Sequence, residues 1–263
     1  MADLFGRAGV PALVFSILTL ALLGRAKPLE PVVDALEGRA PLLASEPAPG
    51  EPVILCAGDS LTAMSSSNYP RLLAQRVGAD YRMARVLVAA TPGFTSGEFL
   101  RAARHARLAE RVRPDAVLLL LGTNDVKRSP DWTGARAYRV HMEEIIAMFR
   151  RANPEARIVL ATPPPITRAS LLFTKASARR LAETIVPAVR ELAQREKLAL
   201  VDLYALFSNR PELLGPDGVH PNAAGHSAMA GFFLDALRRE GLVREAAPGA
   251  PPKHGDAEGE GGG

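Results

Sequence analysis

Two polar segments, far apart in the chain, contain residue types that can activate a hydroxyl for attack on a carbonyl. Ser60 stands in Gly58-Asp59-Ser60-Leu61, where an apolar run gives way to a helical segment. Asp217 and His220 stand three residues apart in Asp217-Gly218-Val219-His220-Pro221, and this spacing lets the carboxylate reach the imidazole directly. Gly-Asp-Ser is also a common turn sequence, so a catalytic interpretation of Ser60 depends on further segments.

Two such segments follow apolar runs in the middle of the chain. Gly93 comes after one run, and Gly122-Thr123-Asn124-Asp125 comes after the next. Because the carboxyl ends of parallel strands meet at one edge of a sheet, we expect both segments beside Ser60. Asp59 and Asp125 flank the candidate residues, and we expect them to brace the loops by accepting backbone hydrogen bonds.

Short apolar runs alternate with longer amphipathic segments throughout the central part of the chain. The runs are continuous rather than alternating, which is typical of strands buried on both faces of a parallel sheet. They predict five strands: Val53–Ala57, Met83–Ala90, Ala116–Leu121, Arg157–Ala161 and Leu198–Val201. With helices on both faces, the expected fold is a three-layer α/β/α sandwich whose ligand site lies at the carboxyl ends of the strands.

Helix signals occupy the intervals between the predicted strands. Asn68 before Pro70 and the capping-box spacing of Thr95 and Glu98 mark two helix starts. Longer helices are expected from Thr133 to the stop at Asn153-Pro154, from Leu171 to Glu196, and after Pro221-Asn222.

Taken together, the four polar segments resemble the sequence blocks of the GDSL/SGNH hydrolases in content, order and position. The resemblance covers about residues 53–237. It implies a five-stranded, parallel, flavodoxin-like sheet, no metal or organic cofactor, and a triad in which Ser60 is the nucleophile, His220 the general base and Asp217 the orienting residue. It also implies an oxyanion hole formed by the N–H groups of Ser60 and Gly93 and the side-chain amide of Asn124.

The segment around Gly93 departs from the family pattern, because Thr91 stands where asparagine is common and Pro92 follows it. Gly97 is an alternative to Gly93, although its position in the capping-box segment favours a structural role. His105, His141 and His226 lie in predicted helices, where surface or packing roles are expected.

By this resemblance the chain is a serine esterase that forms an acyl-enzyme on Ser60. The expected substrate is a small-molecule or glycan ester, with short acyl groups such as acetyl on a carbohydrate favoured. Three alternatives remain: a lysophospholipase or lipase-type acylhydrolase, an acyltransferase, and a non-hydrolytic glycan-binding domain of the same fold.

The two ends of the chain differ in composition from the 53–243 hydrolase domain. Residues 1–26 contain a long apolar stretch that predicts a signal peptide or a membrane anchor, and residues 27–52 are a proline-rich linker. Residues 244–263 are rich in glycine and proline and predict a disordered tail. We therefore expect an exported protein that is periplasmic, extracellular or anchored to the membrane by its N-terminal segment.

Net charge and cysteine content argue against several other classes of protein. The formal net charge of +4 is spread along the chain rather than gathered in one block, so nucleic acid is not an expected partner. Cys56 is the only cysteine, which excludes an intrachain disulfide and a cysteine-based zinc cluster. Its apolar neighbours predict a buried thiol that fills core space. The sequence leaves the oligomeric state open.

Overall fold

The computed structural model describes residues 52–63, 68–80, 84–127 and 134–243. It contains one parallel sheet with the strand order β2-β1-β3-β4-β5, which is the flavodoxin-like order. The strands are β1 (Val53–Gly58), β2 (Arg85–Ala90), β3 (Ala116–Leu120), β4 (Arg157–Ala161) and β5 (Ala199–Val201). Each of the five predicted strands is therefore confirmed to within one or two residues.

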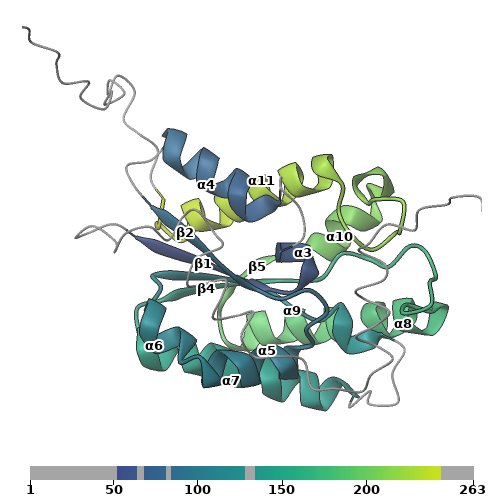
Figure 1. Ribbon diagram of the computed structural model, residues 1–263, viewed down its shortest axis with the longest axis horizontal. Helices are drawn as coiled ribbons and strands as arrows, with labels where there is room; N and C mark the ends of the chain where they lie inside the picture. Colours follow the sequence, from purple (N-terminus) through teal and green to yellow (C-terminus); the bar gives the residue numbers. More distant parts are fainter. Residues whose placement is uncertain (1–51, 64–67, 81–83, 128–133, 244–263) are drawn as a thin grey trace, which may run out of the picture.

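Helices cover both faces of the sheet, as Figure 1 shows. One face carries α4 (Tyr69–Asp80), α10 (Leu203–Ser208) and α11 (Ala223–Arg239). The other face carries α5 (Ser96–His105), α6 (Leu108–Val112), α7 (Gly134–Ala152) and α9 (Val186–Arg195). The expected three-layer α/β/α sandwich is confirmed.

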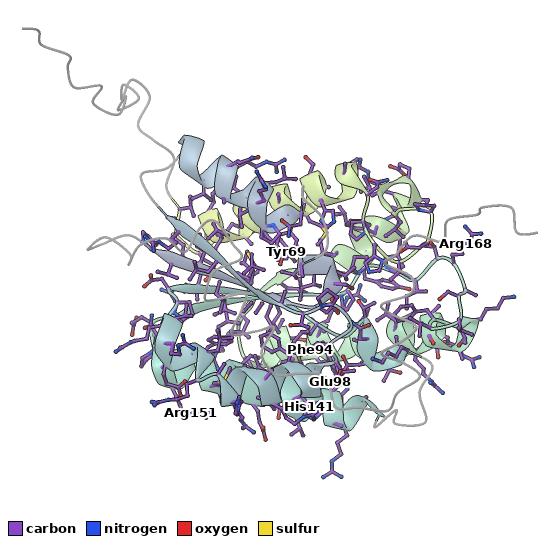
Figure 2. All side chains as sticks on the ribbon, viewed as in Figure 1. Tyr69, Phe94, Glu98, His141, Arg151 and Arg168 are labelled. Carbon is purple, nitrogen blue, oxygen red and sulfur yellow. The ribbon has the colours of Figure 1, made fainter. Side chains whose placement is uncertain are left out.

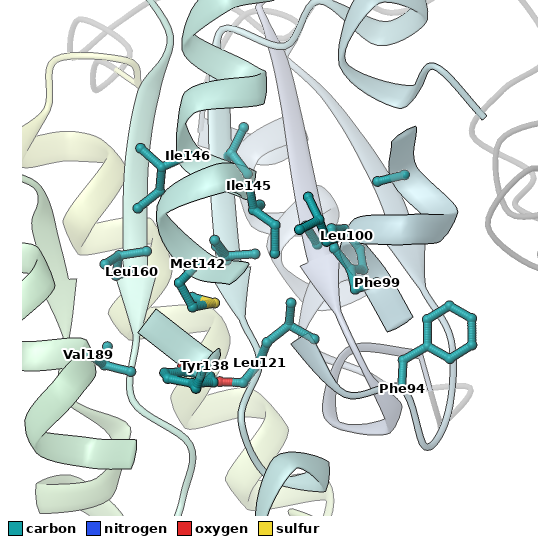
Figure 3. Close-up of a cluster of buried hydrophobic side chains, with 14 of the residues drawn as sticks. Phe94, Phe99, Leu100, Leu121, Tyr138, Met142, Ile145, Ile146, Leu160 and Val189 are labelled. Atoms are coloured by element: carbon teal, nitrogen blue, oxygen red, sulfur yellow. The ribbon is translucent and has the colours of Figure 1, made fainter. Parts of the chain in front are cut away.

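The central strands are buried on both sides, and their side chains alternate between two hydrophobic clusters. In β1, Leu55 points into the cluster on the α5 and α7 side, whereas Ile54 and Cys56 point into the cluster on the α4 and α11 side. Figure 3 shows part of the first cluster, where Phe99, Met142 and Ile145 pack together. The free thiol of Cys56 is fully buried, and this burial raises its pKa well above the usual range.

Helix starts follow the capping signals of the sequence. Asn68 Oδ1 accepts the Arg71 N–H at the start of α4, and Thr95 and Glu98 form the predicted reciprocal capping box of α5. Asn222 Oδ1 accepts the Gly225 N–H at the start of α11, without a reciprocal bond. α7 ends at Ala152, next to the predicted stop at Asn153-Pro154.

The prediction of one helix from Leu171 to Glu196 was wrong at its start. Residues 170–173 form a turn in which the Ser170 N–H donates to the Phe173 carbonyl, and helix α8 (Lys175–Arg180) begins only after Thr174. Thr174 and Ser177 form a capping box, which fixes this boundary. A π-helical turn, Leu181–Ile185, then leads into α9 shortly before Pro187, whose ring nitrogen cannot donate to the preceding turn.

Several sequence predictions fall outside the described residues. These are the apolar segment of residues 1–26, almost all of the proline-rich linker of residues 27–52, and the tail of residues 244–263. Among the described residues, no helix has the length and apolar character needed to cross a bilayer.

The order of the strands reverses between β1 and β3, and ligands of open α/β sheets bind at the carboxyl end of such a switch point. Ser60 follows β1 and Asn124 follows β3, so both flank this point. Between β3 and Asn124 the chain turns at Gly122, whose φ of +128° is accessible mainly to glycine.

We predict that Gly122→Ala destabilises the protein. A Cβ at this position would lie 2.7 Å from Ile185 Cγ2 and 3.2 Å from Pro163 Cγ, in addition to the backbone strain. Strain and overpacking together should lower the free energy of unfolding by roughly 2–5 kcal/mol, measured by urea denaturation.

Gly241→Ala is the matched control. Gly241 also has a positive φ, of +71°, but nothing lies within 4 Å of a Cβ placed there. This variant should therefore show only the cost of left-handed backbone, about 1–2 kcal/mol. Equal losses in the two variants would show that packing around residue 122 adds nothing.

Candidate active site

Ser60 is the first residue of α3 (Ser60–Ala63), a single helical turn at the carboxyl end of β1. Asp59 holds this turn: its Oδ1 accepts the Leu61 N–H at 3.0 Å, and its carbonyl accepts the N–H groups of Thr62 and Ala63 at 3.1 Å. The side chain of Asp59 is fully buried, and Ser60 is 7% exposed. The hydroxyl therefore lies on a rigid turn at the edge of the sheet.

His220 connects Ser60 with Asp217. The Nε2 atom of His220 lies 2.9 Å from Ser60 Oγ, and Nδ1 lies 2.6 Å from Asp217 Oδ2. The second oxygen, Oδ1, accepts the backbone N–H groups of Val219 and His220 at 3.0 Å each. The loop thus brings its own carboxylate and imidazole together, as the spacing predicted, and aims the ring at the serine.

The carboxyl of Asp217 is ionised in this arrangement. Partial burial by itself would raise its pKa, but hydrogen bonds from the His220 ring and from the two backbone N–H groups outweigh burial and lower the pKa to about 2. An ionised carboxylate can only accept, so the proton of the ring resides on Nδ1. The Nε2 atom is then free to accept the Ser60 hydroxyl proton.

Asn124 lies in the one-turn 3₁₀ helix Asn124–Val126 and is buried. Its Nδ2 donates to Asp59 Oδ2 and to the Phe94 carbonyl, both at 3.1 Å. The amide nitrogen carries two hydrogens, so both already have acceptors. The amide can donate to a third group, such as an oxyanion, only if one of these two bonds is shared or released. The sequence did not predict that both hydrogens are already engaged.

Burial gives Asp59 an unusual pKa. Removal from water raises it to about 7, against the lowering effect of the Leu61 N–H, the His220 ring and the Asn124 amide. Asp125 is a second buried carboxyl nearby, and burial raises its pKa as well. These two groups brace the loops, as predicted, but they do so at the cost of desolvation.

Asp125 and His141 both bind the start of α5. The two oxygens of Asp125 accept the Ser96 N–H at 3.2 and 3.0 Å, and Oδ1 also accepts the Ser96 hydroxyl at 2.5 Å. His141 Nδ1 lies 3.1 Å from the same hydroxyl. This contact gives His141 a packing role, and it joins the turn after β3 to the helix after β2.

Gly93 occupies a tight turn after β2, in which the Phe94 N–H donates to the Thr91 carbonyl at 3.2 Å. Pro92 followed by a glycine with a φ of +79° is typical of a type II turn. Gly97 instead lies inside α5, where a Cβ would be 2.7 Å from the His141 ring. The expected structural role of Gly97 agrees with this close packing.

His226 lies on α11 and is almost fully buried. Burial, together with the nearby His220, lowers its pKa to about 4, so the ring is neutral near pH 7. Its Nδ1 has no hydrogen-bond partner among the residues that the structure describes. A packing role, as predicted from the sequence, fits this environment.

One neighbouring loop has contacts that the sequence did not reveal. Residues 162–174, between β4 and α8, reach the Asp217–His220 loop through Thr167 and Arg168. Their partners lie about fifty positions away along the chain, and no local pattern marks such a contact. Residues 64–67 and 128–133 lie outside the described residues.

Comparison with known proteins connects this geometry with a family. Residues 56–228 match the sequence model of the GDSL-like Lipase/Acylhydrolase family. An acetylxylan esterase of Xylanibacter ruminicola is 28% identical over 222 residues, which cover 74% of this chain and 45% of that protein. An acetylxylan esterase of Geobacillus stearothermophilus is 29% identical over 135 residues, which cover 46% of this chain and 58% of that protein. The chain thus spans about half the length of these two relatives.

Solved structures show the same fold. A lipase/acylhydrolase from Enterococcus faecalis superposes with a TM-score of 0.60 at 23% sequence identity, covering 74% of this chain and 99% of that one. At this identity the likeness concerns the fold.

The raised pKa of the buried Asp59 carboxyl makes the stability of the protein depend on pH. Its pKa is higher in the folded protein, about 7, than the ordinary value of 3.8, so protonation favours folding. The contribution of this protonation to the free energy of unfolding is complete when the pH is below the ordinary pKa of 3.8. It is lost as the pH rises through the folded-state pKa of about 7. We predict that the free energy of unfolding of the wild type, minus that of Asp59→Asn, decreases between about pH 5 and about pH 8.

Urea denaturation of both proteins across this range is the measurement. Subtracting the variant cancels the titration of His226 and other groups, which both proteins retain. A difference that stays constant, or that increases with pH, would mean that Asp59 is ionised in the folded protein throughout.

Proposed function

Because the chain belongs to the GDSL-like lipase/acylhydrolase family, we propose that it is a serine esterase that hydrolyses carboxylic esters through an acyl-enzyme on Ser60. The observation that carries this proposal is the 2.9 Å separation of His220 Nε2 and Ser60 Oγ. The other ring nitrogen of His220, Nδ1, is hydrogen-bonded to Asp217 Oδ2. A hydroxyl in hydrogen-bond contact with a neutral imidazole is the arrangement that nucleophilic acyl transfer requires.

The first half of the reaction forms the acyl-enzyme. Ser60 Oγ attacks the ester carbonyl carbon while its proton moves to His220 Nε2, and a tetrahedral oxyanion results. The imidazolium is stabilised by the Asp217 carboxylate and then gives its proton to the leaving alkoxide, which departs as the alcohol. Water, deprotonated by the same ring, then attacks the acyl-enzyme and releases the carboxylic acid and free Ser60.

The oxyanion needs donors at the carboxyl edge of the sheet. We assign this role to the backbone N–H groups of Ser60 and Gly93 and to the side-chain amide of Asn124. Since the Asn124 amide already has two acceptors, the oxyanion replaces the neutral Phe94 carbonyl, and the bond to Asp59 keeps the amide oriented. Each such donor is worth roughly 3–4 kcal/mol in the transition state.

For the substrate, we propose an acetyl ester on a carbohydrate. The support is the similarity to two proteins named acetylxylan esterases, which match 74% and 46% of this chain.

We predict that the purified protein hydrolyses p-nitrophenyl acetate and acetylated xylan, and that Ser60→Ala lowers kcat at least about 1000-fold on both. The substitution removes the nucleophile but no backbone donor. The measurement is a set of steady-state rates together with the melting temperature of each variant. Equal turnover by wild type and Ser60→Ala would remove Ser60 from the reaction.

A series of p-nitrophenyl esters of increasing acyl length tests the substrate class in the same assay. We expect kcat/KM to be highest for acetate and to fall as the chain grows. A maximum at long acyl chains would contradict the acetyl assignment and favour a lipase-type or lysophospholipase activity, while leaving the role of Ser60 intact.

We further propose that the protein is exported, on the basis of the apolar segment within residues 1–26. Export would bring cell-envelope and extracellular glycans within reach. We predict that full-length protein expressed in its native host is recovered in the membrane or extracytoplasmic fraction, as assayed by immunoblotting. Recovery of all of it in the cytoplasmic fraction would contradict export.

A further inference from the structure

The loop between β4 and α8, residues 162–174, is fixed at both of its ends. At the first end, Thr162 Oγ1 donates to Asp202 Oδ1 at 2.9 Å, and three buried prolines with restricted φ follow. At the other end the Ser170–Phe173 turn closes, Phe173 is buried, and Thr174 caps α8. The middle of the loop, at Thr167 and Arg168, is thus held between two anchored segments.

This middle part binds the backbone of the Asp217–His220 loop at two points. The Thr167 N–H and Oγ1 both donate to the Gly218 carbonyl, at 2.8 and 3.2 Å. The Arg168 guanidinium donates through Nη1 to the Pro216 carbonyl at 2.8 Å. The two accepting carbonyls flank Asp217 on either side, so three hydrogen bonds support the residue that orients His220.

The two loops also approach each other closely. Gly218 has a φ of +69°, and a Cβ there would lie 2.5 Å from Arg168 Cβ and 2.7 Å from the Arg168 backbone nitrogen. Ile166 and Val219, one from each loop, are buried in the same hydrophobic cluster. Glycine at position 218 therefore permits a backbone contact that a side chain would prevent.

The other backbone bonds of the Asp217–His220 loop lie within its own hairpin, whose two sides meet at Leu214 and Pro221. Its internal bonds close a turn, from the Gly218 N–H to the Gly215 carbonyl at 2.9 Å and from the Gly215 N–H to the His220 carbonyl at 2.7 Å. Those bonds fix the shape of the loop, and the buried side chains of Val219 and Leu214 attach it to the two hydrophobic clusters. The bonds from Thr167 and Arg168 hold the backbone on either side of Asp217. Asp217 itself is exposed, so packing does not hold its side chain in place.

We propose that Thr167 and Arg168 are positioning residues that hold the Asp217–His220 loop at the distance from Ser60 that proton transfer requires. This inference rests on the proposed esterase function. Arg168 is the better residue to substitute, because its bond to Pro216 comes from the side chain, whereas the shorter of the two Thr167 bonds comes from the backbone and survives substitution. A displacement of the ring by about 1 Å would be enough to slow the reaction about a hundredfold.

The test compares Arg168→Ala with Arg168→Lys and Thr167→Val on p-nitrophenyl acetate. We expect Arg168→Ala to lower kcat about 10- to 100-fold with little change in KM, because the ring is misplaced in the transition state rather than in substrate binding. Lysine can restore one donor to Pro216 and should recover most of the rate. Thr167→Val keeps the backbone bond to Gly218 and should show a smaller loss.

Arg151→Ala is the matched control. Arg151 is also an exposed arginine, and Figure 2 shows it at the opposite end of the molecule from Arg168. Its removal should leave kcat and KM unchanged. Melting temperatures of all variants separate misplacement of the ring from loss of folding.

A second readout does not depend on turnover. The Nδ1–H proton of His220, shared with Asp217, should give a downfield proton NMR resonance, and its exchange with water should accelerate in Arg168→Ala but not in Arg151→Ala. If wild type shows no activity that depends on Ser60, the proposed function fails, and this exchange rate alone decides whether the loop is held by Arg168.

Two outcomes would overturn the inference. One is a folded Arg168→Ala variant with the kcat and the Nδ1–H exchange rate of the wild type. The other is an increase in KM with unchanged kcat, which would assign Arg168 to contact with the substrate instead.

Discussion

A hydrogen bond between two side chains 160 positions apart forms only if the backbone is held in place at both ends. Here the bond joins His220 Nε2 with Ser60 Oγ, and much of the fold serves to fix its two ends. Ser60 is fixed by the end of β1 and by the capping oxygen of Asp59. His220 depends on a short loop, to which the neighbouring β4–α8 loop is joined by the hydrogen bonds of Thr167 and Arg168. Ser60 thus belongs to the edge of the sheet, whereas His220 belongs to a pair of hydrogen-bonded loops.

The floor of the site is polar and buried, which is costly unless every group is paired. Asp59 and Asp125 are both removed from water, and each offsets this cost by accepting hydrogen bonds from a neighbouring turn. Through these bonds the turns after β1, β2 and β3 form one connected network. The same network determines which hydrogens of the Asn124 amide are available to a substrate. The buried carboxyl of Asp59 therefore influences the chemistry of the site without taking part in it.

The sequence predicted much of this arrangement, and its failures have physical causes. Strands buried on both faces are continuous apolar runs, so their bounds were predicted closely, and the local spacing of Asp217 and His220 was enough to predict their contact. The start of the helix after β4 was placed too early, because the apolar residues 171–173 have no local mark that separates a buried turn from a helix. The contacts of Thr167 and Arg168 could not be predicted, since they depend on how two loops meet in space.

Cys56, in the interior strand β1, reports on unfolding of the protein. It is the only thiol in the chain, it is fully buried in β1, and its raised pKa keeps it protonated in the folded state. A thiol of this kind is inert toward alkylating reagents until the surrounding strands separate. The rate at which iodoacetamide labels the native protein therefore measures how often strand β1 separates from its neighbours, without any dye or engineered tag.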